Sequence, residues 1–158
     1  MAAFGGRADL MSLLDPRKGA PAIPQSGTFN GAAICCAAGV AGYGGITPEI
    51  QMHIDSLADT LRAGANALFQ RLEIKAQMVG VGSLFNIHFT EEPITDYRCV
   101  ARSDRKADEV LALALMNRGI ILAPRGMGCT SSVMTAGDVQ EFLAALEASL
   151  VEDLELSH

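Results

Sequence analysis

Residues 26–31 are the part of this sequence best suited to hold a ligand. They read SGTFNG and are followed directly by AAICCAAG, an apolar run that suits a buried helix. A threonine hydroxyl, backbone N–H groups beside glycines and a helix N-terminus all favour an anion such as phosphate. The same small polar residues also suit a loop that only caps the helix. Spacing alone leaves both interpretations open, and a capping loop is the commoner use of such residues.

A second candidate is Arg125, which follows a predicted strand in the stretch LAPRGM and lies beside Gly126. An arginine there can bind a carboxylate through two parallel hydrogen bonds, although a merely solvent-facing arginine is the more common case. His88 falls on the more polar face of another predicted strand, where a structural role is a simpler interpretation than ligand binding. The sequence contains no G-x-G-x-x-G, G-x-S-x-G, HExxH or P-loop pattern.

Composition excludes several classes of protein. The chain has 158 residues, 49% of them hydrophobic and 19% charged, which is enough for a folded core. A net charge of -6 without a Lys/Arg cluster argues against a nucleic-acid or anionic-membrane partner. The first residues do not resemble a signal peptide, and no apolar run reaches the ~20 residues of a membrane helix. The four cysteines include no CxxC pair, so neither zinc nor a disulfide framework is expected, and a cytoplasmic protein fits best.

Periodicity predicts the scaffold that must position these residues. A Pro-rich loop is expected over 15–28, and Thr47 followed by Pro48 reads as the start of a long amphipathic helix. Further helices are predicted at 8–14, 32–41, from Ser103 or Asp104 to 117, and from Thr135 or Asp138 to 150. Alternation predicts a strand at 84–89, a short buried strand at 120–124 and a polar loop over 125–133.

This order of elements predicts an α/β fold. Residues 47–158 alternate helices with strands, which suits a small α+β domain with helices packed on a short, mostly antiparallel sheet. Residues 1–46 do not complete a layer of their own. They read as a remnant of a larger domain that includes the 26–31 loop.

Six motifs in series carry a resemblance to a known family. AFGGRADLM, SGTFNG with its Ala-rich helix, VGSLFNIHFT, the YR of DYR, RGIILAPRGM and the closing helix occur in this order. Together they resemble the C-terminal portion of class III pyridoxal-phosphate (PLP) aminotransferases, in the branch of glutamate-1-semialdehyde aminomutase. The resemblance covers nearly the whole chain. It implies a fold type I enzyme that works as a homodimer with PLP at the subunit interface.

The resemblance also implies roles for particular residues. Thr28 would reach across to the phosphate of the partner's PLP, and Ser26, Gly27 and Phe29 would complete the cradle. Arg125 looks like the carboxylate-binding arginine of relatives that act on β-amino acids. Residues after about 47 would form the connecting helix and the small domain that closes over an amino-acid substrate.

Two departures from the family pattern limit the function that the resemblance implies. The lysine that binds PLP covalently lies before the FGG segment in the family, and Lys18, Lys75 and Lys106 do not match it. NGAA also replaces the more usual Asn-Pro after the glycine. The expected function is therefore that of a C-terminal portion of an aminotransferase or aminomutase, inactive alone and dependent on a second copy or an N-terminal PLP-lysine domain. A non-catalytic oligomerisation module or a truncated gene product are the alternatives.

Overall fold

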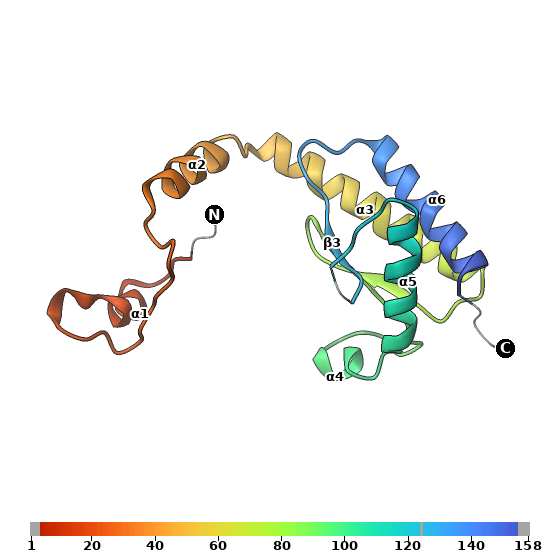
Figure 1. Cartoon of the computed structure of the whole chain (residues 1–158), viewed down its shortest axis with the longest axis horizontal. Helices are drawn as coiled ribbons and strands as arrows, with labels where there is room; N and C mark the ends of the chain where they lie inside the picture. The colour runs from red at the N-terminus through yellow and green to blue at the C-terminus, as the bar shows by residue number, and fades with distance from the viewer. Residues whose placement is uncertain (1–3, 124, 155–158) are drawn as a thin grey trace. The chain divides into compact units, whose positions relative to one another are not determined.

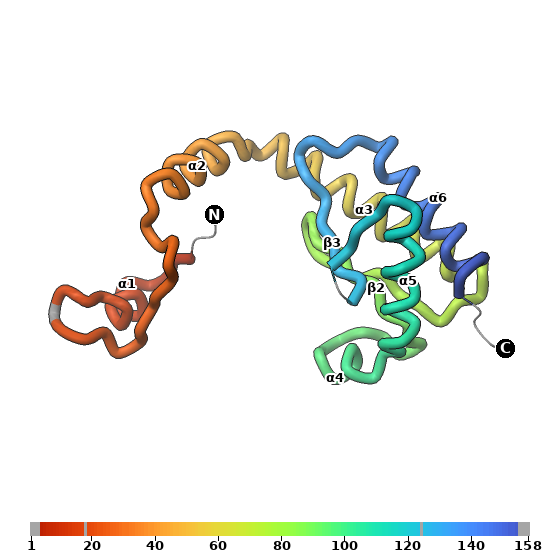
Figure 2. The backbone as a smooth tube through the Cα atoms, viewed as in Figure 1, coloured from red at the N-terminus to blue at the C-terminus, as the bar shows by residue number. Residues whose placement is uncertain are grey.

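The computed structural model describes residues 4–123 and 125–154, apart from the side chain of Lys18 (Figures 1 and 2). The chain divides into two compact units, Met1–Thr47 and Pro48–His158. The boundary lies one residue from the predicted division between 46 and 47. The assignment of the first part to a PLP-binding large domain remains a prediction.

The first unit consists of short helical segments joined by loops. The predicted helix at 8–14 is present as α1 (Ala8–Met11) and a 3-10 turn, η1 (Ser12–Leu14), and a second 3-10 turn, η2 (Pro16–Lys18), follows. The Asp15 side chain caps η2 by accepting from the Arg17 backbone N–H at 3.0 Å. After the predicted loop comes α2 (Ala33–Gly44), which extends three residues beyond its predicted end.

The second unit begins with α3 (Pro48–Arg71), as the Thr47-Pro48 signal predicts. Its buried face repeats at helical spacing and comprises Leu57, Ala58, Leu61, Ala65 and Phe69. Gly64 faces α6, because a Cβ built on it would lie only 2.5 Å from Leu143 Cδ1. Gly64 lowers the intrinsic helix propensity of α3, but it allows α6 to pack closely against α3.

A three-stranded antiparallel sheet, in the order β1-β2-β3, forms the centre of this unit. β2 (Leu84–His88) lies within the predicted strand at 84–89, whereas β1 (Gln77–Val79) precedes that segment. β3 (Met127–Cys129) pairs with β2, with Phe85 opposite Gly128. The antiparallel sheet confirms the predicted fold class.

The predicted buried strand at 120–124 is wrong. Within the described residues 120–123, only Ala123 makes a bridge, to Met127, and Ile121 is 79% exposed. The strand that joins the sheet lies in the segment predicted to be a polar loop. Gly128 is required there, because a Cβ would lie 2.3 Å from the Phe85 ring. Pro124, which was predicted to close the strand, lies outside the described residues.

Three further helices complete the unit: α4 (Tyr97–Val100), α5 (Arg105–Asn117) and α6 (Ala136–Glu152). Asp104 is the N-cap of α5 and accepts from the Lys106 and Ala107 N–H groups. Thr135 and Asp138 together form a capping box at the start of α6. Of the two predicted starts, Thr135 is the N-cap, and Asp138 is the third residue of the helix. The short α4 was not predicted.

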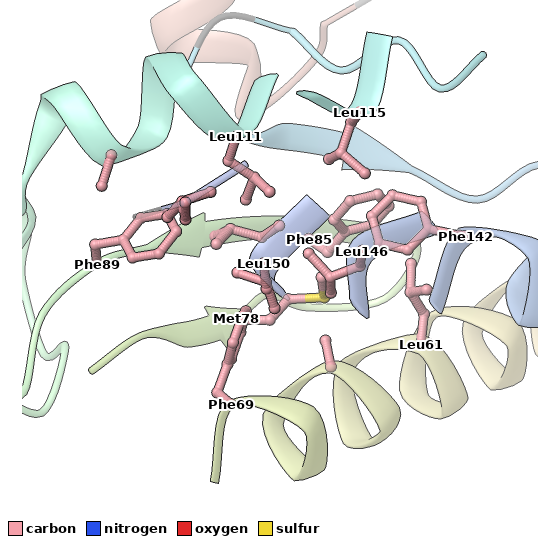
Figure 3. Packing of buried hydrophobic residues seen from close by; sticks show 14 of the residues in the cluster. Leu61, Phe69, Met78, Phe85, Phe89, Leu111, Leu115, Phe142, Leu146 and Leu150 are labelled. Atoms are coloured by element: carbon pink, nitrogen blue, oxygen red, sulfur yellow. The ribbon is translucent and has the colours of Figure 1, made fainter. Parts of the chain in front are cut away.

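One hydrophobic core lies between the helices and one face of the sheet (Figure 3). α3 packs against β1, β2 and α6, and α5 packs against α6. Figure 3 shows Phe85 of β2 beside Phe142 of α6, and their rings meet edge to face with centroids 5.6 Å apart. The sheet face with Met78, Phe85 and Ile87 is thus the one that the helices cover.

Candidate functional site

Residues 26–31 form a tight turn directly before α2. The Asn30 N–H donates to the Gly27 carbonyl at 2.9 Å, and the Ala32 N–H donates to the Phe29 carbonyl at 3.2 Å. Gly31 has φ 72°, a left-handed conformation that glycine adopts without strain. The turn brings together the predicted residues Ser26, Gly27, Thr28 and Phe29, and it leaves all four exposed.

Gly27 is needed for the shape of this turn. A Cβ added to it would lie 2.8 Å from the Asn30 side-chain oxygen. The Asn30 amide thus fills the inside of the turn. The Thr28 hydroxyl and the 76% exposed Phe29 ring remain accessible from outside.

The N-terminus of α2 adds electrostatic suitability for an anion. Its N-cap is Ala32, which has no side-chain oxygen and makes no capping hydrogen bond. The N–H groups of the first turn, which begins at Ala33, are therefore not capped by a side chain at this position. The dipole of the 12-residue helix places partial positive charge at the same end. The turn and the helix start together suit a phosphate group.

Arg125 belongs to the second unit and lies in a turn between Ala123 and β3. The Gly126 N–H donates to the Ala123 carbonyl at 3.1 Å, and the Ala123 N–H donates to the Met127 carbonyl at 2.9 Å. Arg125 is exposed and has φ 76°, a left-handed conformation that is unfavourable for a residue with a Cβ. No ion pair to Arg125 occurs among the described residues.

Gly126 anchors this turn to the centre of the sheet. It is buried with φ 75°, and its carbonyl accepts from the Ile87 N–H at 3.3 Å. A Cβ there would lie 3.2 Å from the Ile87 carbonyl oxygen, so the backbones are in close contact. The guanidinium of Arg125 therefore extends from a turn whose backbone is held against β2.

His88 does not have the exposure that the alternation predicted. It is only 5% exposed, and burial lowers the pKa of its imidazole below the usual value. Burial and a neutral ring at neutral pH suit the structural role predicted for it.

Sequence reasoning missed Asp108, a buried carboxyl in the first turn of α5. It is 6% exposed, and burial, with a smaller contribution from the Asp104 charge, raises its pKa to about 6. The Phe89 backbone N–H weakly opposes the rise in pKa, and Oδ1 has no hydrogen-bond partner. An acidic residue in the first turn of a helix ordinarily indicates a favourable dipole interaction at the surface, so the sequence carried no signal of its burial.

The lysines described in full lie outside the candidate loop. Lys75 is exposed and pairs with Glu91, and Lys106 is exposed in α5, so both belong to the second unit. These two residues therefore give no support for a covalent lysine beside the loop.

Among the described residues, no group of three or more His, Cys, Asp or Glu is arranged to hold a metal ion. All four cysteines are free thiols. No helix in the described parts of the chain has the length and apolarity needed to cross a membrane.

Comparison with known proteins places the chain in a family. No family model matches it. It is 38% identical over 145 residues to the β-phenylalanine transaminase of Variovorax paradoxus, covering 91% of this chain and 33% of that protein. It is 31% identical over 151 residues to a glutamate-1-semialdehyde 2,1-aminomutase of Lachnoclostridium phytofermentans, covering 93% of this chain and 35% of that protein.

The structural comparison agrees with the sequence comparison. An ω-transaminase from Sphaerobacter thermophilus matches with a TM-score of 0.75 and 32% identity, covering 92% of this chain and 34% of that one. The chain thus spans about a third of the length of the relatives that it matches. Over the portion that it matches, this chain belongs to the class III pyridoxal-phosphate-dependent aminotransferases, in the branch that holds the glutamate-1-semialdehyde aminomutases.

Proposed function

We propose that the chain supplies the phosphate-binding loop and the substrate-closing small domain of a PLP-dependent aminotransferase or aminomutase. The similarity over 91% of the chain to a β-phenylalanine transaminase carries this proposal. In such an enzyme, bound PLP draws electrons from the amino-bearing carbon of the substrate and so allows a proton to be lost there. The substrate is a small amino acid, and the working unit is a homodimer with PLP at the subunit interface.

The turn at 26–31 would hold the phosphate of PLP bound mainly by a second subunit. The exposed Thr28 hydroxyl would donate one hydrogen bond to the phosphate, and the N–H groups at the start of α2 would add positive potential. Gly27 keeps the turn compact, and exposed Ser26 and Phe29 flank the hydroxyl. These features support a phosphate subsite that is complete only when the rest of the cofactor site is supplied.

Arg125 would bind the carboxylate of the substrate. Its guanidinium is exposed and has no ion-pair partner among the described residues, so both of its donor edges are available to a ligand. Its left-handed backbone is costly to the fold, and strain of this kind is concentrated at functional sites. Both observations favour a binding role over that of an ordinary surface arginine.

A second candidate function is that of a non-catalytic oligomerisation module. α2 favours it, because Ile34 is 81% exposed, Val40 is 74% exposed, and Gly39 is the one buried residue of the helix. Large apolar side chains on one exposed helix are a common mark of a protein interface. The two candidates differ in their dependence on PLP.

A chimera tests the primary proposal. This chain would replace the matching third of the Variovorax β-phenylalanine transaminase, and PLP absorbance and turnover would be measured. We expect PLP binding and activity in the chimera and neither in the free chain. Within the chimera, T28A should weaken PLP binding about tenfold by removing one hydrogen bond to a charged group, and T28S should restore it. A folded chimera without PLP absorbance would leave the oligomerisation module as the better account.

A further inference from the structure

Residues 90–103 form a loop whose two ends meet at one hydrogen bond. The loop leaves the sheet after Phe89 and returns at Asp104, where the Asp104 N–H donates to the Phe89 carbonyl at 3.0 Å. Figure 1 shows this loop, with α4, beside the start of α5. A surface loop closed at its ends in this way is of the Ω type. We refer to residues 90–103 as the α4 loop and to the contact between Phe89 and Asp104 as its neck.

The two limbs of the α4 loop are held differently. The first limb is tied to the edge of the sheet, because the Gln77 side chain donates to the carbonyls of Thr90 and Glu92 at 3.2 and 2.8 Å. Arg102 of the second limb pairs with Glu92, but both side chains are more than half exposed, so the pair contributes little. Ser103 is the one buried residue of this loop, all of which the structure describes. Segments with so few buried side chains open at low cost, and the second limb is the part that is free to do so.

Two buried polar groups without partners lie where the second limb enters α5. Ser103 is 8% exposed and Asp108 is 6% exposed, and neither the Ser103 hydroxyl nor Asp108 Oδ1 has a hydrogen-bond partner among the described residues. Because Asp104 is the N-cap of α5, Ser103 and Asp108 occupy the positions N′ and N4. In many helices these two positions carry apolar side chains whose contact fixes how the chain enters the helix. Here both side chains are polar and unsatisfied, so the contact that should fix the neck is a costly one.

The ionisation state of Asp108 sets the size of this cost. Burial raises the pKa of its carboxyl to about 6. On the same helix, the charges of Asp104 and Glu109 raise this pKa as well, whereas Arg105 lowers it. The ionised carboxylate is therefore surrounded by more negative than positive charge.

The strand side of the neck offers the carboxylate little compensation. The Phe89 N–H only weakly opposes the rise in its pKa. His88, the preceding residue of β2, is buried with a lowered pKa and adds no positive charge near neutral pH. Water is the remaining group that could solvate an ionised Asp108, and water reaches it when the neck opens.

We propose that the protonation state of Asp108 controls opening of the α4 loop at its neck. The neutral carboxyl allows the neck to close, and the ionised carboxylate favours release of residues 93–103 with loss of the hydrogen bond between Asp104 and Phe89. The opening requires no cofactor, so this inference is separate from the proposed function.

The direction of the pH effect follows from the closed and open states. In the open loop the carboxyl has its ordinary pKa of 3.8, and in the closed loop its pKa is about 6. Between these values the open state loses its proton first, so opening increases as pH rises, and above about 6 it stays constant. The ratio of open to closed loop should rise on the order of 50-fold between about pH 4 and about pH 8.

Hydrogen–deuterium exchange followed by mass spectrometry tests this in the full chain. The natural protein and D108N are compared at about pH 4 and about pH 8, on peptides within residues 93–102 and within α3. Both proteins have the same sequence over these peptides, so their chemical exchange rates are equal at each pH. For residues 93–102, we expect the exchange rate of the natural protein relative to D108N to rise on the order of 50-fold between the two pH values. For α3 this relative rate should change much less, because the core stays closed.

Two further variants make the outcome decisive. S103A removes the buried hydroxyl but keeps the carboxyl, so it should retain the pH dependence of the natural protein. D108A removes the charge with a different side chain and should behave as D108N does, and circular dichroism verifies that each variant is folded. A relative exchange rate of residues 93–102 that is the same at both pH values overturns the inference. An equal change in α3 also overturns it, because Asp108 would then act only on global unfolding, and loss of the pH dependence in S103A would contradict the role of the carboxyl.

Discussion

Removal of the buried charge at Asp108 should change how the stability of the second unit depends on pH. The carboxyl is 6% exposed and has one oxygen without a partner, and its pKa is raised to about 6 from 3.8. Asp104 and Glu109 raise this pKa further, whereas Arg105 and the Phe89 N–H oppose the rise. Ionised Asp108 is therefore poorly compensated in the folded protein.

The sign and size of the effect follow from the two pKa values. Below pH 3.8 the carboxyl is neutral in both the folded and unfolded states and costs nothing. Between pH 3.8 and about 6 the unfolded state loses its proton first, so the free energy of unfolding falls as pH rises. Above about 6 the full difference applies, and a shift of roughly two units corresponds to about 3 kcal/mol.

The variant D108N removes this titration while keeping nearly the same side-chain size and shape. Urea denaturation followed by circular dichroism gives the free energy of unfolding of each variant at about pH 3 and about pH 8. We expect D108N to gain about 3 kcal/mol relative to the natural protein between these two pH values. Any cost of placing the amide N–H₂ in the unpartnered position is constant with pH and cancels in this comparison.

The control is E141Q, which removes an exposed carboxylate from α6. It should change stability by less than about 0.5 kcal/mol at both pH values, because surface substitutions away from special features have small effects. If the difference between D108N and the natural protein is the same at low and high pH, then Asp108 is not an uncompensated buried charge, and the reasoning fails.

Substitutions at four further positions test local features of the backbone and one helix cap. Glu73 lies two residues after the end of α3 and has φ 55°, and Gly119 takes the equivalent position after α5 with φ 82°. Because glycine adopts this left-handed conformation without strain, E73G should stabilise the unit by about 1 kcal/mol in urea denaturation. G119A should destabilise the unit by a similar amount. Arg125 has φ 76°, so R125G should be about 1 kcal/mol more stable than R125A, and equal stability would refute strain at that turn. The Thr135 side chain accepts from the Asp138 N–H in the capping box, so T135A should lower the free energy of unfolding by about 1 kcal/mol and T135S should largely retain it, as measured by thermal and urea unfolding.

Local signals in the sequence predicted the helices well. Pro48 at the start of α3, Asp104 before α5 and Thr135 before α6 are all confirmed as helix starts. Caps and apolar periodicity act within one or two turns of the chain, so the residues that decide them are neighbours in sequence. The order of the motifs likewise identified the family, which the comparisons confirm.

The strands were predicted less well, for a physical reason. The run IILA suits a buried strand, yet Ile121 is 79% exposed, and β3 forms instead at Met127–Cys129. A short apolar run does not specify its partner, and strand pairing depends on residues far away in sequence. Here Gly128 decides the pairing, because only a residue without Cβ fits against the Phe85 ring.

The sequence by itself determined the longer helices, the family and the candidate residues 26–29 and Arg125, because these depend on residue types and local spacing. Tertiary structure alone decided which groups are buried and which are strained. Asp108 became an uncompensated carboxyl where the start of α5 meets the end of β2, and His88 became buried. Arg125 acquired its left-handed backbone in the turn that Gly126 holds against Ile87. Burial and strain arise from packing between distant segments, which no local pattern encodes.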